Sequence, residues 1–232
     1  ITKMHRRGFQ VYALLGSYYL KTWEYILPKN RRTAVRMFGN VLRYNDRSDT
    51  ESRFDGVNVD IEPYMLDDWT EKKPLRINQY LQLSAELMRM KINAGSTILV
   101  GPAMPFWFDG IEDITWGGSR KRLSDHVQDI YDYVAIMDYR NYAEGRDSII
   151  SHAADELDYA DRIGRMVVIG LETGKFEPQK VTFYGKGSTY LEQELRLAET
   201  AFTPHRSFAG FAIHHLQTYR NLSETNADPF RL

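Results

Sequence analysis

Residues 54–64 read Phe-Asp-Gly-Val-Asn-Val-Asp-Ile-Glu-Pro-Tyr, an alternation of apolar and polar side chains that is typical of a β-strand. Successive strand residues point to opposite faces, and the apolar positions on one face are Val57, Val59 and Ile61. The polar positions on the other face are Asn58, Asp60 and Glu62. Two carboxylates on one strand face repel each other, and burying either is costly unless it is hydrogen-bonded or holds a proton. The stretch therefore predicts a strand whose polar face carries acid–base chemistry.

Short apolar runs of the same kind recur along the chain, each rich in Val, Ile or aromatic residues and bounded by Gly or Pro. They cover residues 9–16, 56–63, 97–104, 133–140, 166–174 and 208–216. Amphipathic helical patterns lie between them, at about 31–46, 76–94, 124–132, 148–163 and 188–202. Ser148 and Ser188 stand where N-caps are expected, and Gly95 stands where a helix should end. This alternation of strands and helices predicts an α/β fold with a parallel sheet.

The alternation fits either an open doubly wound sheet or most of a (β/α)8 TIM-type barrel. No Gly-rich phosphate fingerprint follows the first strand, which leaves a dinucleotide site without support. Candidate functional residues instead follow the carboxyl ends of at least four strands, where barrel enzymes carry their chemistry. A complete barrel takes about 250 residues. We therefore expect 1–232 to be a single barrel domain that lacks its first one or two strand–helix units in this chain.

The composition excludes several classes of function. Lys and Arg total 30 against 31 Asp and Glu, so the basic excess of a nucleic-acid-binding protein is missing. With no cysteine, the chain has no disulfides, thiolate metal sites or cysteine nucleophiles. No apolar run approaches the ~20 residues of a membrane helix, and the first residues do not form a signal peptide. No helix carries histidines or carboxylates at metal-ligand spacing, so we expect neither a metal nor another cofactor. We interpret the basic segment 117–122 as a solvated loop.

Residues 55–62 resemble the strand-four signature of family 18 glycoside hydrolases, the chitinase-like barrels, which reads Asp-Gly-x-Asp-x-Asp-x-Glu. Asp55, Gly56, Asp60 and Glu62 match this signature, and Asn58 replaces its middle aspartate. The resemblance implies that Glu62 protonates the glycosidic oxygen. It also implies that Asp60 orients a substrate N-acetyl group for attack on the anomeric carbon, a variant of the two-carboxylate scheme.

A second motif resembles the same family. Residues 136–140, Ile-Met-Asp-Tyr-Arg, are similar to its strand-six Met-x-Tyr-Asp, with Met137 and Tyr139 matching and Arg140 replacing the aspartate. Strand parity places Met137 and Tyr139 toward the inside of the barrel. The last strand ends in His214 and a second histidine, where the family usually has a tryptophan. The resemblance implies a carbohydrate substrate and favours an extracellular or cell-surface location.

Glu172 supports a competing mechanism. It ends the run 166–174, which is strand seven if 56–63 is strand four. An acid on strand four and a nucleophile on strand seven is the pattern of clan A retaining glycosidases. In that scheme Glu172 attacks, Glu62 protonates the leaving oxygen, and roughly 5–5.5 Å separates the two carboxyl groups. The alternative interpretation of Glu172 is a structural ion pair with Arg140.

Aromatic residues occur in the loops after the first three strands, where they would suit stacking on sugar rings. They are Tyr18, Tyr19, Trp23, Tyr64, Trp69, Phe106 and Trp107. The sequence thus predicts a glycoside hydrolase-like enzyme whose catalytic residues are Glu62, Asp60, Glu172 and Tyr139. The predicted substrate contacts are Asn58, Trp107, Met137, Arg140, His214 and Tyr64.

Two other functions stay open from the sequence: a non-catalytic carbohydrate-binding barrel, and a barrel amidase or lyase that uses the same carboxylates. We expect the predicted site residues to line one pocket at the carboxyl ends of the strands. We also expect Glu62 to titrate above its reference pKa of about 4.3, because other carboxylates surround it. The sequence sets no oligomeric state.

Overall fold

A computed structural model describes residues 1–223 as an α/β fold. Its main sheet has six strands in the order β1-β2-β3-β6-β7-β8. They are β1 (Tyr12–Leu15), β2 (Gly56–Val59), β3 (Leu99–Pro105), β6 (Tyr133–Met137), β7 (Met166–Glu172) and β8 (Phe208–His214). The pairs β1–β2, β2–β3 and β7–β8 are parallel. The predicted α/β class and the six strands are confirmed, whereas residues 1–223 do not supply the eight strands of a complete barrel.

The chain divides into two compact units. Unit 1 comprises Ile1–Met104 and Glu112–Val134, and unit 2 comprises Pro105–Ile111 and the chain from Ala135 onward. Among the residues that the structure describes, no helix has the length and apolar character needed to cross a bilayer.

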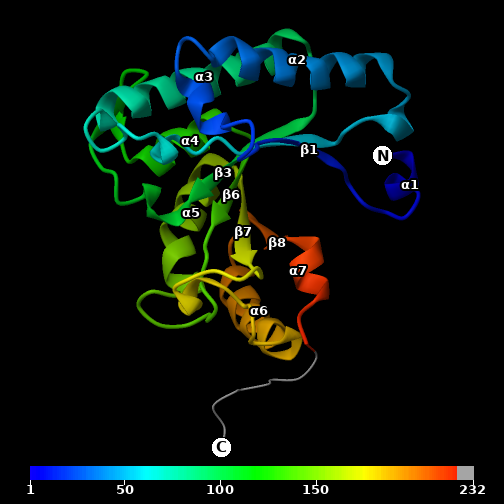
Figure 1. Ribbon diagram of the computed structural model, residues 1–232, viewed down its shortest axis with the longest axis vertical. Coiled ribbons are helices and arrows are strands. Elements are labelled where there is room, and N and C mark those ends of the chain that lie inside the picture. The colour runs from blue at the N-terminus through cyan, green and yellow to red at the C-terminus, as the bar shows by residue number, and fades with distance from the viewer. Residues whose placement is uncertain (224–232) are drawn as a thin grey trace, which may run out of the picture. The chain divides into compact units, whose positions relative to one another are not determined.

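Unit 1 carries its helices around β1, β2 and β3. They are α1 (Thr2–His5), α2 (Arg31–Arg47), α3 (Lys73–Asn93) and α4 (Leu123–Ile130), with 3-10 turns η1 (Thr22–Ile26), η2 (Thr50–Ser52) and η3 (Pro63–Met65). Helices α2 and α3 pack side by side (Figure 1). The long helix α3 ends just before Gly95, whose φ of +58° is the left-handed conformation expected after a helix. The predicted end of this helix is therefore confirmed.

A β-hairpin replaces the solvated loop expected at 117–122. Its strands are β4 (Ile114–Trp116) and β5 (Ser119–Lys121), which pair antiparallel. Gly117 and Gly118 form the turn, and both have positive φ, at 56° and 82°. Two such residues favour the tight hairpin turn whose twist matches that of the strands. Arg120 and Lys121 thus lie on a short ordered strand, and Arg122 is the N-cap of α4.

Unit 2 contains α5 (Ile149–Ile163), α6 (Ser188–Phe202), α7 (Leu216–Arg220) and the 3-10 turns η4 (Phe106–Phe108) and η5 (Gln179–Val181). Ser148 caps α5 as predicted, because its side chain accepts from Ser151 N at 3.2 Å in a reciprocal capping box. The N-cap predicted at Ser188 is wrong. Gly187 precedes the helix, and Ser188 is its first helical residue.

The two faces of the decisive strand differ in burial as predicted. Val57, Val59 and Ile61 are at most 2% exposed. The polar residues of the opposite face, Asn58, Asp60 and Glu62, are half-buried. The ladder of β2 ends at Val59, so Asp60 and Glu62 follow the carboxyl end of the strand rather than lying within it. This position suits groups that contact a substrate.

Candidate functional site

The carboxylate site of unit 1 is formed by Asp60, Glu62 and Tyr64. Residue 63 is a proline that starts η3, which turns the chain so that Tyr64 faces back toward Glu62. The Tyr64 hydroxyl donates a short hydrogen bond to Oε1 of Glu62. This bond fixes the orientation of the Glu62 carboxyl, as a proton-transferring group requires.

Asp60 is held by its backbone and by a close approach to β1. Its N–H donates to the Leu15 carbonyl at 2.9 Å, and its carbonyl accepts from Thr22 Oγ1 at 3.2 Å. A Cβ built on Gly16 would lie 2.4 Å from Asp60 Cβ and 2.8 Å from Asp60 Oδ2. Glycine is thus required at position 16, because any side chain would occupy the space of the carboxylate.

Substituting Gly16 with alanine is expected to destabilise the protein by about 1–3 kcal/mol, since the added methyl group overpacks against Asp60. The urea midpoint of unfolding measures the effect. Gly110→Ala is the matched control, because its Cβ would meet its nearest atom, the Trp107 carbonyl oxygen, at an ordinary 3.5 Å. Equal midpoints for the two variants would contradict the packing that positions Asp60.

Tyr80 of α3 belongs to the electrostatic surroundings of these carboxylates. It is 2% exposed, and burial, together with Tyr131, Asp60 and Glu62, raises the pKa of its phenol well above the ordinary value. A buried tyrosine at an apolar position of a helical stripe looks like a core residue in the sequence. No sequence signal marked its closeness to the site.

Asn58 contacts a tyrosine where the family motif has an aspartate. Its Nδ2 donates to Tyr133 Oη at 3.4 Å, and the Tyr133 hydroxyl donates to the Val57 carbonyl at 3.3 Å. Burial raises the pKa of Tyr133 to about 12, against the lowering effect of the Asn58 hydrogen bond. Asn58 is therefore engaged with a neutral phenol.

An aromatic cluster follows β1 in unit 1, formed by Tyr18, Tyr19 and Trp23. Tyr18 and Tyr19 are 73% and 95% exposed. The Tyr18 ring lies 5.4 Å from the Trp23 ring and 6.3 Å from the Tyr19 ring. Trp23 belongs to η1, which packs against η3 and therefore close to the carboxylate site. Exposed rings in this place can stack on the faces of sugars.

Glu172 in unit 2 is almost fully buried, at 2% exposure. Its Oε1 accepts from Gly174 N at 2.5 Å, and its Oε2 lies 2.7 Å from His214 Nδ1. The ion pair with Arg140 that the sequence left open is not formed. Arg140 instead pairs with Asp147 at 2.5 Å.

The other predicted residues of unit 2 lie near the ends of its strands. Met137 and Tyr139 are half-buried, as their inward parity predicts. Arg140 is 8% exposed, donates to the Tyr139 carbonyl at 2.7 Å, and lies over the Phe106 ring at 5.0 Å. Trp107 is 37% exposed. Phe106 is half-buried, with the His152 ring stacked on it, whereas Trp107 is the more exposed of the two rings.

A hydrogen-bonded chain of two carboxylates and one imidazole in unit 2 was not predicted from the sequence. His152 Nδ1 lies 2.8 Å from Asp138 Oδ1, and its Nε2 lies 3.0 Å from Asp147 Oδ1. The His152 ring stacks on Phe106 at 3.9 Å. Burial raises the pKa of Asp138 to about 6, although His152 and Arg140 lower it. Asp138 occupies the unspecified position of the Met-x-Tyr-Asp motif, which is why the motif gave no reason to single it out.

The predicted site residues therefore fall into two groups. Unit 1 holds Asn58, Asp60, Glu62 and Tyr64, and unit 2 holds Trp107, Met137, Tyr139, Arg140, Glu172 and His214. That both groups line one pocket stays a prediction. Across residues 1–223, no three His, Asp or Glu side chains are grouped so that they could hold a metal ion.

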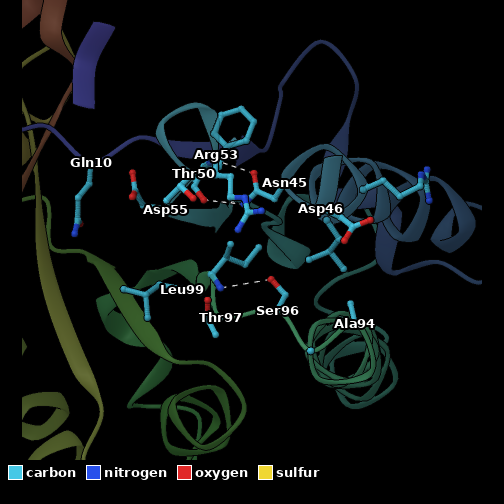
Figure 2. Close-up of a pocket in the computed structure, with 15 residues that line it drawn as sticks. Gln10, Asn45, Asp46, Thr50, Arg53, Asp55, Ala94, Ser96, Thr97 and Leu99 are labelled. Carbon is cyan, nitrogen blue, oxygen red and sulfur yellow. Dashed lines mark hydrogen bonds between the residues drawn. The ribbon is translucent and has the colours of Figure 1, made fainter. Parts of the chain in front are cut away.

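A groove of about 690 Å³ lies in unit 1 at the amino ends of the strands (Figure 2). Asp55, which directly precedes β2, lines it, as do Asn45 and Arg53. Asp55 accepts from Val11 N at 2.6 Å and lies 2.9 Å from His5 Nε2. Burial opposes ionisation of Asp55, but these hydrogen bonds lower its pKa overall. Since Asp55 secures the chain that enters β1, we assign it a structural role.

No protein-family model matches the chain, and the curated proteins contain no match. Among solved structures, the chitinase from Chromobacterium violaceum ATCC 12472 is 16% identical, with a TM-score of 0.45 over 74% of this chain and 52% of that one. Catalytic domain 2 of the Ostrinia furnacalis group II chitinase is 15% identical, with a TM-score of 0.45 over 74% and 47%. The GH18 chitinase from Cycas revoluta is 12% identical, with a TM-score of 0.46 over 94% and 91%. The chain spans about half the length of the first two structures.

Proposed function

We propose that this protein is a glycoside hydrolase-like enzyme in which Glu62 protonates the leaving glycosidic oxygen. The observation that carries the proposal is the carboxylate site itself. Glu62 follows the carboxyl end of a parallel strand, is half-buried, and is oriented by the Tyr64 hydroxyl. Asp60 lies two residues away on the same face. Most glycosidases use such a pair of carboxyl groups to cleave the glycosidic bond.

The roles within the site follow from its contacts. Oε1 of Glu62 accepts from Tyr64, which orients the carboxyl group that transfers the proton. Asp60 carries negative charge beside the reacting sugar, which stabilises the positive charge that develops at the anomeric carbon. The aromatic cluster of Tyr18, Tyr19 and Trp23 supplies the stacking surface for a sugar ring.

Between the two mechanisms, the contacts of Glu172 favour substrate assistance. A nucleophilic carboxylate needs an oxygen that can reach the anomeric carbon. Glu172 is 2% exposed, and its two oxygens contact Gly174 N and His214 Nδ1. The substrate class is accordingly a sugar whose N-acetyl group acts as the nucleophile, with Asp60 as the residue that orients it.

Hydrolysis of labelled glycosides tests this function. We expect release of the label from N-acetylhexosaminides and their oligomers, and none from the matching sugars that carry a 2-hydroxyl group. Cleavage of both kinds at equal rates would contradict substrate assistance while leaving the hydrolase intact. Binding of N-acetylated oligosaccharides without cleavage would instead identify a non-catalytic carbohydrate-binding protein.

A further inference from the structure

Glu172 and His214 lie opposite each other on the neighbouring parallel strands β7 and β8 of unit 2. Glu172 is 2% exposed, whereas the side chain of His214 is 58% exposed. Of the two, the imidazole is therefore the group that solutes can reach. The carboxylate lies beneath it.

The contact between the two side chains assigns a hydrogen to one nitrogen of His214 when Glu172 is ionised. An ionised carboxylate can only accept hydrogen bonds, so the 2.7 Å contact to Glu172 Oε2 requires a hydrogen on Nδ1. The other carboxylate oxygen accepts from Gly174 N at 2.5 Å, which prevents the carboxyl from turning away. In the neutral ring Nε2 is then the basic nitrogen. A carboxylate that holds an imidazole in this tautomer is the arrangement that makes histidine an effective base.

The backbone of His214 is also hydrogen-bonded to the residue that follows β7. Its carbonyl accepts from Thr173 N at 2.8 Å and from Thr173 Oγ1 at 2.9 Å. The Tyr139 ring stacks on the imidazole with its centroid 6.4 Å away. His215, whose ring packs against His214 at 5.3 Å, is also titratable, and Arg220 lies on α7, a helix that packs against β8. The geometry is that of a preorganised proton-transferring group.

We infer that His214 accepts and donates protons through Nε2, toward water or a substrate hydroxyl, and that Glu172 is its positioning residue. The sequence predicted that Glu172 is a nucleophile and that His214 contacts the substrate, whereas this assignment gives the proton transfer to His214. It stands on unit 2 alone and does not require that Glu62 be a catalytic acid.

Nitrogen-15 NMR of the histidine side chains tests the inference without any activity assay. In the wild-type protein we expect neutral His214 to carry its hydrogen on Nδ1, which is the rarer tautomer of free histidine. In Glu172→Gln we expect the acid dissociation constant of His214 to rise about tenfold, because the ring loses a neighbouring negative charge. His5 in unit 1, which contacts Asp55, is the internal control, and its side-chain signals should not change.

The tautomer of His214 in the wild-type protein tests the inference even if Glu172→Gln does not fold. A neutral His214 with its hydrogen on Nε2 overturns the inference, and so does an unchanged titration in folded Glu172→Gln. Acylation by diethyl pyrocarbonate supplies a chemical readout of access to Nε2, followed by fragment-ion mass spectrometry. We expect His214 to react, and modification of His215 alone would overturn the inference.

Discussion

Replacing Glu62 with glutamine is expected to lower kcat/KM by about a thousandfold on every unactivated glycoside that the protein cleaves. The side chain keeps its shape and can still accept from Tyr64, but it has no proton to give to the leaving oxygen. General acid catalysis contributes about 10²–10⁴-fold to rate. A thousandfold loss corresponds to about 4 kcal/mol of transition-state stabilisation.

The dependence on the leaving group separates a proton donor from a binding residue. Dinitrophenyl glycosides release a stable anion that needs no protonation, so Glu62→Gln should cleave them within about tenfold of the wild-type rate. Tyr64→Phe should cost about tenfold on unactivated substrates, because it removes only the hydroxyl that orients Glu62. Glu51→Gln is the matched control, since Glu51 is exposed in unit 1 and pairs with the exposed Arg6. Wild-type rates in Glu62→Gln on all substrates would refute the proposed acid.

Most of the fold could be predicted from the sequence, because strands and helices carry different apolar periods. The predicted strand and helix segments all correspond to observed elements, and the predicted face of β2 is correct at Val57, Val59 and Ile61. The hairpin at 114–121 was missed because its strands have only three residues each, too few to show an alternation. The N-cap at Ser188 was misplaced by one residue, since the glycine before it is the N-cap and Ser188 is the first helical residue.

The candidate site was predictable only where function follows from position on a single strand. Asp60 and Glu62 could be singled out because the strand alternation predicts that they share a polar face. Gly16, by contrast, matters because its missing Cβ leaves space for a carboxylate 44 positions further along the chain. The partner of Glu172 depends on the register between β7 and β8, which the sequence does not specify. Such pairings arise from tertiary packing and carry no local pattern.

Glu156 of α5 provides the largest expected effect on stability. It is 1% exposed, and neither carboxyl oxygen has a hydrogen-bond partner among the described residues. Burial, together with the nearby carboxylates Asp109, Asp155 and Asp138, raises the pKa of Glu156 to about 9, against a smaller lowering by its own backbone. The folded protein therefore holds a proton on Glu156 at neutral pH, whereas the unfolded chain releases it.

The sign of the pH dependence follows from this difference in bound protons. From about pH 4.5 to about pH 9 the folded state binds one more proton than the unfolded state, so stability falls as pH rises. In Glu156→Gln this contribution vanishes, because the amide does not titrate. The free energy of unfolding of the variant should therefore rise relative to that of the wild type by about 4 kcal/mol between pH 5 and pH 8.

Urea unfolding at a series of pH values measures the predicted gain. Glu199→Gln makes the same chemical change at an exposed position of α6, and its stability should run parallel to that of the wild type. Parallel curves for Glu156→Gln as well would mean that Glu156 ionises normally in the folded protein. An ionised carboxylate that is buried without a hydrogen-bond partner is several kcal/mol less stable than the same group in water. Normal ionisation of Glu156 would therefore require a solvating partner that its buried position on α5 does not provide.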